Sequence, residues 1–226
     1  MLIMRTLLAL LMVIFGLMGW SITANAIDGS YWQLPVGTKI TTKTLGVLRV
    51  VRVDGLEYDL VTEQGKVATY LTPFKQISRM QTYQIAKGDM SSLWPLSVGK
   101  TVSLEIFRGS GVWYSEIAVN GLEELEYNDH RVDCFVVIEN LRKAGSEYRH
   151  EWKRWYCPEA RFVLKGEYFV TGGPSYGNRK TFLIRKIVFP DGEQPTRLIG
   201  APETSDISST INEKSQVPAE TAHNRD

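Results

Sequence analysis

The chain has 226 residues, of which 26 are basic and 25 acidic, so its formal net charge is only +1. A balance this close to neutral argues against a polybasic protein that binds nucleic acid or anionic membranes. A chain of this length can bury a sizeable core in one domain, particularly if that domain is built from strands.

Residues 1–26 have the three parts of a secretory signal peptide. Arg5 supplies a positive charge, Leu7–Trp20 is an apolar run of 14 residues, and an A-x-A cleavage site ends at Ala26. The alternative is a membrane anchor, but the run is shorter than the about 20 residues that span a bilayer. We therefore expect a periplasmic or secreted protein that begins at Ile27 and keeps no transmembrane anchor.

The first part of the mature chain, residues 27–85, has the pattern of an antiparallel meander. The run Lys39–Val53 is rich in β-branched residues, Leu56–Thr62 alternates between apolar and polar residues, and Val67–Leu71 follows a Gln-Gly turn. The next stretch, Thr82–Ser92, is polar, and we interpret it as a connection.

A second meander is expected over residues 93–190. Its first residues, Trp94–Thr101, repeat the Trp, Leu, Val and Gly of Trp32–Thr38 at an offset of 62. Two copies indicate either a distant duplication or a strand start that was used twice. Further along, Asn120-Gly121 predicts a turn, and the acidic Leu122–Asp129 is compatible with a short helical turn or an irregular strand.

The clearest hairpin signal lies in residues 131–157, which hold both cysteines. A four-residue loop over Ala144–Glu147 makes the numbers of paired residues sum to 291, which places Cys134 opposite Cys157. Opposed residues have Cβ atoms about 4.5–5.5 Å apart, and a disulfide needs roughly 3.5–4.5 Å. In an oxidising compartment we expect the two to form a disulfide, the alternative being two buried thiols that never meet.

The composition shifts near the C-terminus. Residues 191–226 are rich in Pro, Ser, Thr, Glu and Asn, contain no aromatic residue, and cannot bury enough apolar surface to offset the entropy of ordering. We predict one folded domain over residues 27–195 and a disordered tail over residues 196–226. The mature chain shows no long apolar period of 3.6 residues, so the predicted fold is mainly β, with antiparallel strands.

Four short runs resemble a pattern found in a large family of uncharacterised exported bacterial proteins. They match a "PL-x-VGK" strand start, a "V-x-G-x-E" strand, a "G-x-F/C" strand and a "WYAPE" strand end. In this sequence the runs are Leu93–Lys100, Val119–Glu123, Asp133–Phe135 and Trp155–Glu159, within residues 93–170.

This resemblance implies an open, strongly curved antiparallel half-barrel of the lipoprotein-carrier (LolA/LppX-like) type. It also implies a concave apolar surface for a lipid or another amphiphile. The chain departs from the pattern at Cys157, where the family has Ala, and in Leu122–Leu125, which is more acidic. The disulfide would therefore be a local addition to the family fold.

The sequence contains no H-E-x-x-H, no P-loop and no C-x-x-C motif. His130 precedes Cys134 by four residues on a strand, which separates them by about 13 Å and disfavours a thiol–imidazole pair. The other histidines, His150 and His223, have no ligand spacing around them. We expect no catalytic residue, no metal and no cofactor.

Basic and aromatic residues interleave in Tyr148–Tyr156. Such a stretch can stack on planar or sugar ligands, and the alternative is an amphipathic strand with rings in the core and charges in solvent. If the domain has a ligand surface, its candidate residues are Trp113, Trp152 and Tyr156.

The sequence therefore favours a non-enzymatic periplasmic β-sheet protein that binds an apolar or amphiphilic, lipid-like ligand or an envelope partner. The alternative is an envelope scaffold without a small ligand, whose sheet face docks another protein. A hydrolase of envelope material is disfavoured because the nucleophile and base are missing. The expected partners are a hydrophobic ligand or an envelope protein, and not nucleic acid.

Overall fold

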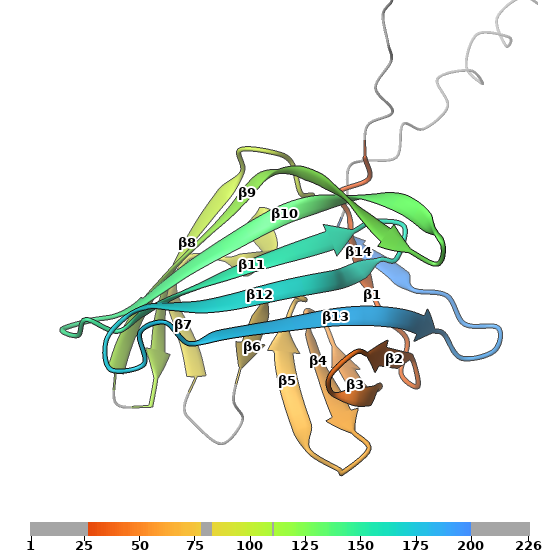
Figure 1. The fold of residues 1–226 in the computed structure, drawn as a ribbon, viewed down its shortest axis with the longest axis horizontal. Coiled ribbons are helices and arrows are strands. Elements are labelled where there is room, and N and C mark those ends of the chain that lie inside the picture. The colour runs from red at the N-terminus through yellow and green to blue at the C-terminus, as the bar shows by residue number, and fades with distance from the viewer. Residues whose placement is uncertain (1–26, 78–82, 110, 200–226) are drawn as a thin grey trace, which may run out of the picture.

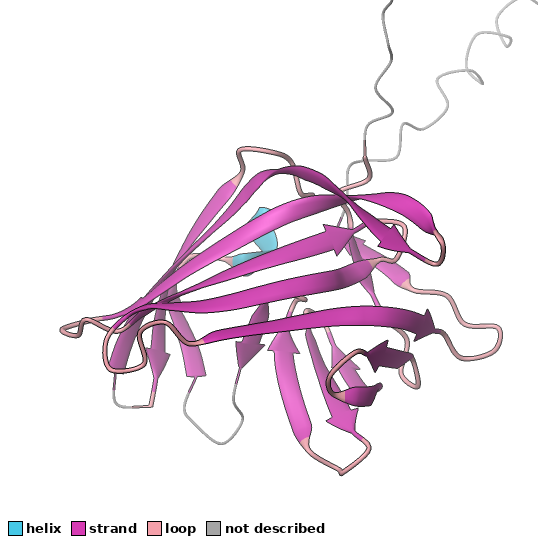
Figure 2. Ribbon diagram, viewed as in Figure 1, coloured by secondary structure: helices cyan, strands magenta, loops and turns pink. Residues whose placement is uncertain are grey.

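The computed structural model describes residues 27–77, 83–109 and 111–199. Within them the regular secondary structure is all strand except for one short 3-10 helix (Figure 2). The elements in chain order are β1 (Tyr31–Gln33), β2 (Lys39–Thr42), β3 (Gly46–Asp54), β4 (Glu57–Thr62), β5 (Val67–Leu71), β6 (Lys75–Ile77), β7 (Tyr83–Lys87), η1 (Met90–Leu93), β8 (Thr101–Arg108), β9 (Gly111–Tyr127), β10 (His130–Lys143), β11 (Arg149–Cys157), β12 (Phe162–Gly172), β13 (Arg179–Val188) and β14 (Thr196–Ile199).

Twelve of these strands form one antiparallel sheet in the order β6-β5-β4-β3-β2-β13-β12-β11-β10-β9-β8-β7. The two meanders meet where β2 pairs with β13, as at Ile40 opposite Ile187. The sheet curls strongly, so its edge strands β6 and β7 come round toward each other (Figure 1). The prediction of a mainly-β, strongly curved half-barrel built from meanders is confirmed.

The central hairpin has the register expected from its loop. Phe135 lies opposite Tyr156 and Val136 opposite Trp155, so the numbers of paired residues sum to 291. The next pair along the hairpin is Cys134 and Cys157, whose Cα atoms are 4.1 Å apart and whose sulfurs form a disulfide.

The Asn120-Gly121 pair does not turn the chain, and this prediction was wrong. Strand β9 continues through it: Gly121 lies opposite Val136 and Val119 opposite Val137, so Asn120 is the extra residue of a β-bulge. The following acidic stretch is therefore a strand. Its Glu123 carboxylate accepts hydrogen bonds from the Trp155 indole N–H at 2.7 Å and the Lys153 ammonium at 2.8 Å, across the sheet.

Thr82–Ser92 was also misread as a simple connection. Tyr83–Lys87 forms edge strand β7, with Ile85 opposite Ile106 of β8, and the start of helix η1 follows at Met90. An edge strand has a paired partner on one side only, so its polar composition resembles that of a loop. Helix η1 buries Met90 and Leu93 in the interior.

The predicted tail begins too early in the chain. Thr196–Ile199 forms β14, which pairs with β1 in a separate two-stranded sheet, with Trp32 opposite Arg197. The Arg197 guanidinium also donates a hydrogen bond to the Ser30 hydroxyl at 2.9 Å. The folded domain thus extends past residue 195, while the rest of the predicted tail and the predicted signal peptide lie outside the described residues.

The two similar motifs at the starts of the meanders have the same backbone geometry. Gly37 and Gly99 both have positive φ, at 94° and 88°, and each amide donates to a strand further along, at Val50 and Val119. The residue after each glycine donates back three positions, to Pro35 and Ser97. The same glycine turn therefore precedes β2 and β8, which fits either a duplication of the meander or a turn that was used twice.

Aromatic side chains fill one end of the interior. Tyr31, Phe74 and Tyr156 surround Trp94 with ring centroids 5.0–5.3 Å from its own, and all four side chains are buried. The backbone segments at Gly29 and Leu96 are also in close contact here: a Cβ on Gly29 would lie 2.1 Å from the carbonyl oxygen of Leu96. This part of the interior has no room for a ligand.

We predict that the position of a C-terminal truncation decides its effect. A chain ending at Gln194 loses β14 and the Arg197–Ser30 bond, which should lower the stability by about 1–2 kcal/mol and Tm by roughly 3–6 °C. A chain ending at Gly200 keeps both and should melt like the full chain. Thermal unfolding of the three proteins checks this, and equal melting of both truncated forms would contradict it.

Candidate functional site

The other end of the interior holds a cavity of about 390 Å³, which we call the polar cavity. Side chains from both sheet edges and from the strands between them line it, so it exists only because the sheet curls. Strand alternation supplies the lining: β10 contributes Glu139 and Leu141, and β11 contributes His150, Trp152 and Arg154.

A buried ion cluster forms the floor of this cavity. Glu139 accepts from the Lys75 ammonium and, at 2.8 Å, from the Ser115 hydroxyl through Oε1. Its Oε2 accepts from Nη1 of Arg154 at 3.1 Å. Lys75, Glu139 and Arg154 are exposed by only 5%, 2% and 6%, so their charges are compensated by one another rather than by solvent.

The pKa values of the cluster follow from burial and these contacts. Burial alone would raise the pKa of Glu139, but the charges of Lys75 and Arg154, with hydrogen bonds from Lys75 and Ser115, lower it to about 2. Burial lowers the pKa of Lys75 and of Arg154, and Glu139 opposes that shift in both. Glu139 is therefore ionised at neutral pH and has two basic partners.

Six rings form a continuous row across β9, the loop residue before β11, and strands β11, β12 and β13, which we call the aromatic belt. Neighbouring ring centroids lie between 4.9 and 6.3 Å apart. In order, the belt is Trp113, Tyr148, His150, Tyr168, Trp152 and Phe182. The Tyr148 and Tyr168 hydroxyls are 2.9 Å apart and hydrogen-bonded. All but Phe182 line the polar cavity.

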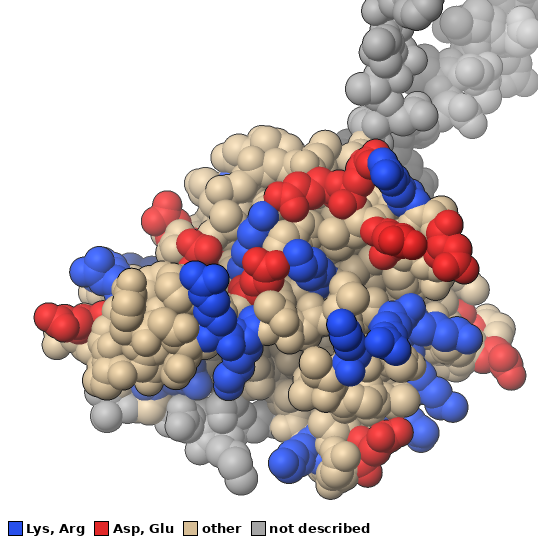
Figure 3. All heavy atoms as spheres, viewed as in Figure 1, with Lys and Arg blue, Asp and Glu red and all other residues tan. Residues whose placement is uncertain are grey.

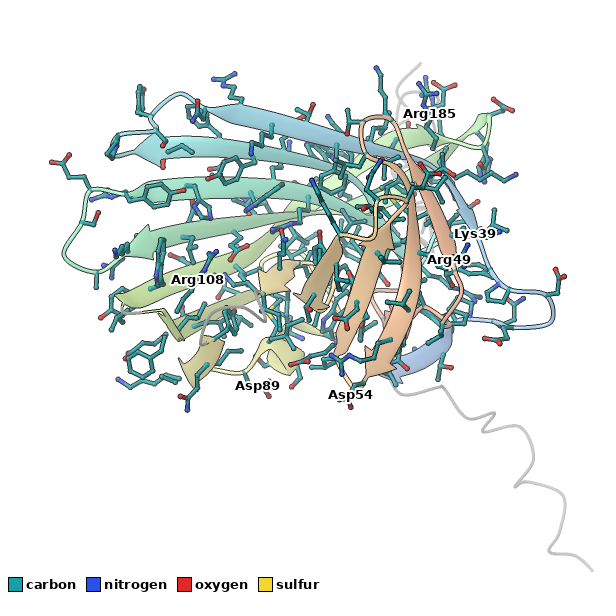
Figure 4. All side chains as sticks on the ribbon, turned by 90° about the horizontal axis from the view of Figure 1, so that it is seen from below. Lys39, Arg49, Asp54, Asp89, Arg108 and Arg185 are labelled. Carbon is teal, nitrogen blue, oxygen red and sulfur yellow. A yellow bond between two sulfur atoms is a disulfide. The ribbon has the colours of Figure 1, made fainter. Side chains whose placement is uncertain are left out.

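Basic groups lie along the belt. The Arg154 guanidinium stands over the Trp152 ring at 4.6 Å, and that of Arg108 over Trp113 at 5.8 Å. Arg108 lies toward one end of the sheet, far from the labelled basic residues at the other end (Figure 4). Lys180 of β13 completes the basic lining of the polar cavity.

Two polar atoms of the lining are buried without a hydrogen-bond partner among the described residues, Nδ1 of His150 and the hydroxyl of Tyr83. Buried polar groups in proteins are nearly always paired, so such atoms in a cavity wall indicate a place for a bound molecule. Burial lowers the pKa of His150 to about 4, with the charges of Lys75, Arg154 and Arg108 acting in the same direction and Glu139 against it. The ring is neutral at pH 7.

A second cavity of about 200 Å³, the apolar cavity, lies between β2–β5 and β11–β13. Its walls include Ile40, Leu60 and Phe182. Gln76, Trp152 and Arg154 line both cavities, so the two adjoin at these side chains. Together they form a site with a charged, aromatic part and an apolar part.

The structure brings together two of the three ligand-contact candidates from the sequence. Trp113 and Trp152 belong to the aromatic belt. Tyr156 shares a face with Trp152 but lines neither cavity: its end of the interior is filled, and its buried hydroxyl donates to the Ser30 carbonyl at 2.8 Å. The disulfide, Cys134–Cys157, lies on the opposite face of the hairpin from Arg154.

The concave side is apolar only in part, and sequence reasoning missed the ion cluster of the polar cavity. The signal was a carboxylate, Glu139, directly after the apolar run Phe135–Ile138. Its partner Lys75 is 64 residues away and reaches the site only through curling of the sheet. No local pattern could have paired them.

The described residues show no group of three His, Cys, Asp or Glu that could hold a metal ion. His130 pairs with Glu159 at 2.5 Å and not with Cys134, whose sulfur is in the disulfide. Nor does the described part of the chain include a helix long and apolar enough to cross a membrane. On the face shown in Figure 3, acidic and basic side chains lie side by side, in keeping with the nearly balanced charge.

Comparison with known proteins gave few matches. No protein-family profile matches this chain, and no curated protein matches it. Among solved structures, it is similar to the hypothetical lipoprotein YmcC from Escherichia coli K12, with 14% identity and a TM-score of 0.43. The match covers 68% of this chain and 85% of that one. A similarity at this level supports no inference about function, and the lipoprotein-carrier type remains a prediction.

We predict that Glu139→Gln strongly destabilises the domain, because it leaves Lys75 and Arg154 buried without their counter-ion. The loss should be about 3–5 kcal/mol in the free energy of unfolding. Adding Lys75→Met to the same chain should recover part of it, since one of the two cations is removed. Urea unfolding measures both.

The matched control is Glu124→Gln, which breaks a pair with Arg131 whose side chains are 58% and 81% exposed. Exposed pairs of this kind contribute little, so no measurable change is expected. Equal stability of the Glu139 and Glu124 variants would contradict the role of the cluster.

We predict that His150 makes the protein less stable in acid. Its folded pKa of about 4 is below the unfolded value of about 6.5, so between these pH values only the unfolded chain takes up the proton. Stability from this group is complete above pH 6.5 and falls by on the order of 2 kcal/mol as pH drops to 4. Urea unfolding of the native protein and His150→Gln at several pH values measures the difference.

His130 serves as a control, because its effect on the pH dependence of stability has the opposite sign. Its hydrogen bond to Glu159 raises its pKa, so its contribution is present at low pH and is lost as pH rises through that value. A His150→Gln variant with the same pH dependence as the native protein would refute the prediction for His150.

Proposed function

We propose that this protein is a non-enzymatic envelope protein that binds an amphiphilic molecule inside its curved sheet. The observation that carries the proposal is the junction of the polar and apolar cavities at Trp152 and Arg154. An amphiphile needs two different environments in contact with each other, and these cavities provide them. The polar cavity alone is within the usual volume range of small-molecule sites.

The lining suits binding rather than chemistry. Its rings offer flat apolar surface, and the atoms of His150 and Tyr83 that lack partners offer directional contacts. Glu139, the one carboxylate of the polar cavity among the described residues, is occupied by Lys75 and Arg154 and is poorly suited to act as a base. These features support a binding protein.

Two features support an exported location. Residues 1–26 have the composition of a signal peptide, with cleavage expected after Ala26. The Cys134–Cys157 disulfide is of a kind that persists in oxidising compartments such as the periplasm. N-terminal sequencing of the protein from the envelope should return Ile27, and an intact Met1 would overturn this part of the proposal.

The binding function is tested by blocking the apolar cavity at its margin. Leu45 lines this cavity and is 56% exposed, so Leu45→Trp should obstruct it without overpacking the core. Val67→Trp, at a residue 59% exposed that lines neither cavity, is the matched control. Both proteins are titrated with decyl maltoside below its micelle concentration, with tryptophan emission as the readout.

We expect saturable binding by the native protein and the Val67 variant and at least a tenfold weaker response from the Leu45 variant. A native protein that binds no amphiphile, and carries none by mass spectrometry after detergent-free purification, would overturn the proposal. Specific capture of another envelope protein on the sheet would then favour the scaffold alternative.

A further inference from the structure

The geometry points to an anionic amphiphile with a single chain as the ligand, its anion in the polar cavity and its chain in the apolar cavity. This inference rests on the proposed function and specifies its ligand. It comes from three properties of the site: the charge of the polar cavity, the position of Arg154, and the volume of the apolar cavity.

The charges of the polar cavity are unequal. Apart from Arg108, the described residues of its lining include three basic side chains, Lys75, Arg154 and Lys180, against one carboxylate, Glu139. Both oxygens of that carboxylate already accept hydrogen bonds. An anionic head group offsets the excess positive charge, whereas a cationic head group is repelled by it.

Arg154 stands at the boundary where the head of an amphiphile meets its chain. It is only 6% exposed, lines both cavities, and is held over Trp152 and against Glu139. Glu139 takes one of its five N–H donors, and a planar guanidinium suits a carboxylate, sulfate or phosphate group. The unpartnered Nδ1 of the neutral His150 and the Tyr83 hydroxyl offer two further contacts in the same cavity.

The volume of the apolar cavity limits the number of chains. At about 200 Å³ it is smaller than the roughly 300–1,000 Å³ of sites that enclose a whole drug-sized ligand. Its walls include the buried side chains Ile40, Leu60 and Ile184, which belong to the packed core of the sheet. It accommodates one alkyl chain, and the two or three acyl chains of a phospholipid or lipoprotein anchor do not fit.

The test compares probes with the same ten-carbon chain and different heads, by calorimetry with the full mature protein. Decanoate is the anion, decyl maltoside the neutral probe and decyltrimethylammonium the cation, each below its micelle concentration. We expect decanoate to bind at least tenfold more tightly than decyl maltoside, and decyltrimethylammonium not to bind. Added salt should weaken the binding of decanoate only. Acetate, an anion without a chain, should not bind at these concentrations.

The matched variants are on one strand. Lys180→Gln removes an exposed basic group that lines the polar cavity, and Lys186→Gln removes an exposed one that lines neither cavity. We expect Lys180→Gln to weaken the binding of decanoate three- to tenfold without changing the binding of decyl maltoside. Lys186→Gln should change neither affinity. Equal loss from both variants would show that the effect is general attraction and would overturn a defined anion site.

The outcomes separate this inference from the proposed function. Equal affinities for decanoate and decyl maltoside would overturn the inference that the head group is anionic, and would leave the proposed function unchanged. Tighter binding of didecanoyl phosphatidylglycerol than of decanoate would overturn the single chain. Acetate binding as tightly as decanoate would identify a site for small anions alone, and failure of all probes would overturn both proposals.

Discussion

The contact on which the interior depends is the one that Glu139 makes with Lys75 and Arg154. Lys75 lies on edge strand β6, at one end of the sheet order, and Glu139 lies on β10, eight strands further along that order. Their pairing joins the edge to the middle of the sheet across its hollow, so the curl that creates the cavities is held by charge as well as by packing. A buried ion pair is a weak source of net stability, but removing one member is expensive. The cluster therefore fixes which shape the sheet takes more than it adds to its stability.

Packing and charge divide the interior between them. The end filled by Trp94 and its neighbours is closely packed, with Gly29 against the Leu96 backbone. The other end keeps open space because polar side chains on β10 and β11 cannot collapse on one another as apolar ones do. The aromatic belt combines both kinds of surface, since its rings offer apolar faces and several of them carry polar groups.

The sequence predicted what local patterns encode. The register of β10 and β11 followed from a loop of four residues, and the strands of the first meander followed from β-branched runs between glycine turns. It did not separate the bulge at Asn120 from a turn, because an Asn-Gly pair suits both and pairing with β10 decides between them. It could not find the site, since Lys75 and Glu139 are brought together by the curvature of the whole sheet. Trp152 was proposed because rings interleave with bases in Tyr148–Tyr156, and the same period of two could not show that Tyr156 lies in the filled part of that face.

The disulfide has a consequence for the charges of the interior. Cys134 and Cys157 point away from the face that carries Glu139 and Arg154, yet they belong to the same two strands and are a few residues along from them. A slip of one residue between these strands would turn one partner of that ion pair outward. The disulfide prevents this slip. Oxidation of the cysteines on one face of the hairpin therefore keeps Glu139 and Arg154 paired on the other face. The arrangement links the integrity of the ion cluster to the redox state of the compartment in which the chain folds, although no sulfur atom touches it.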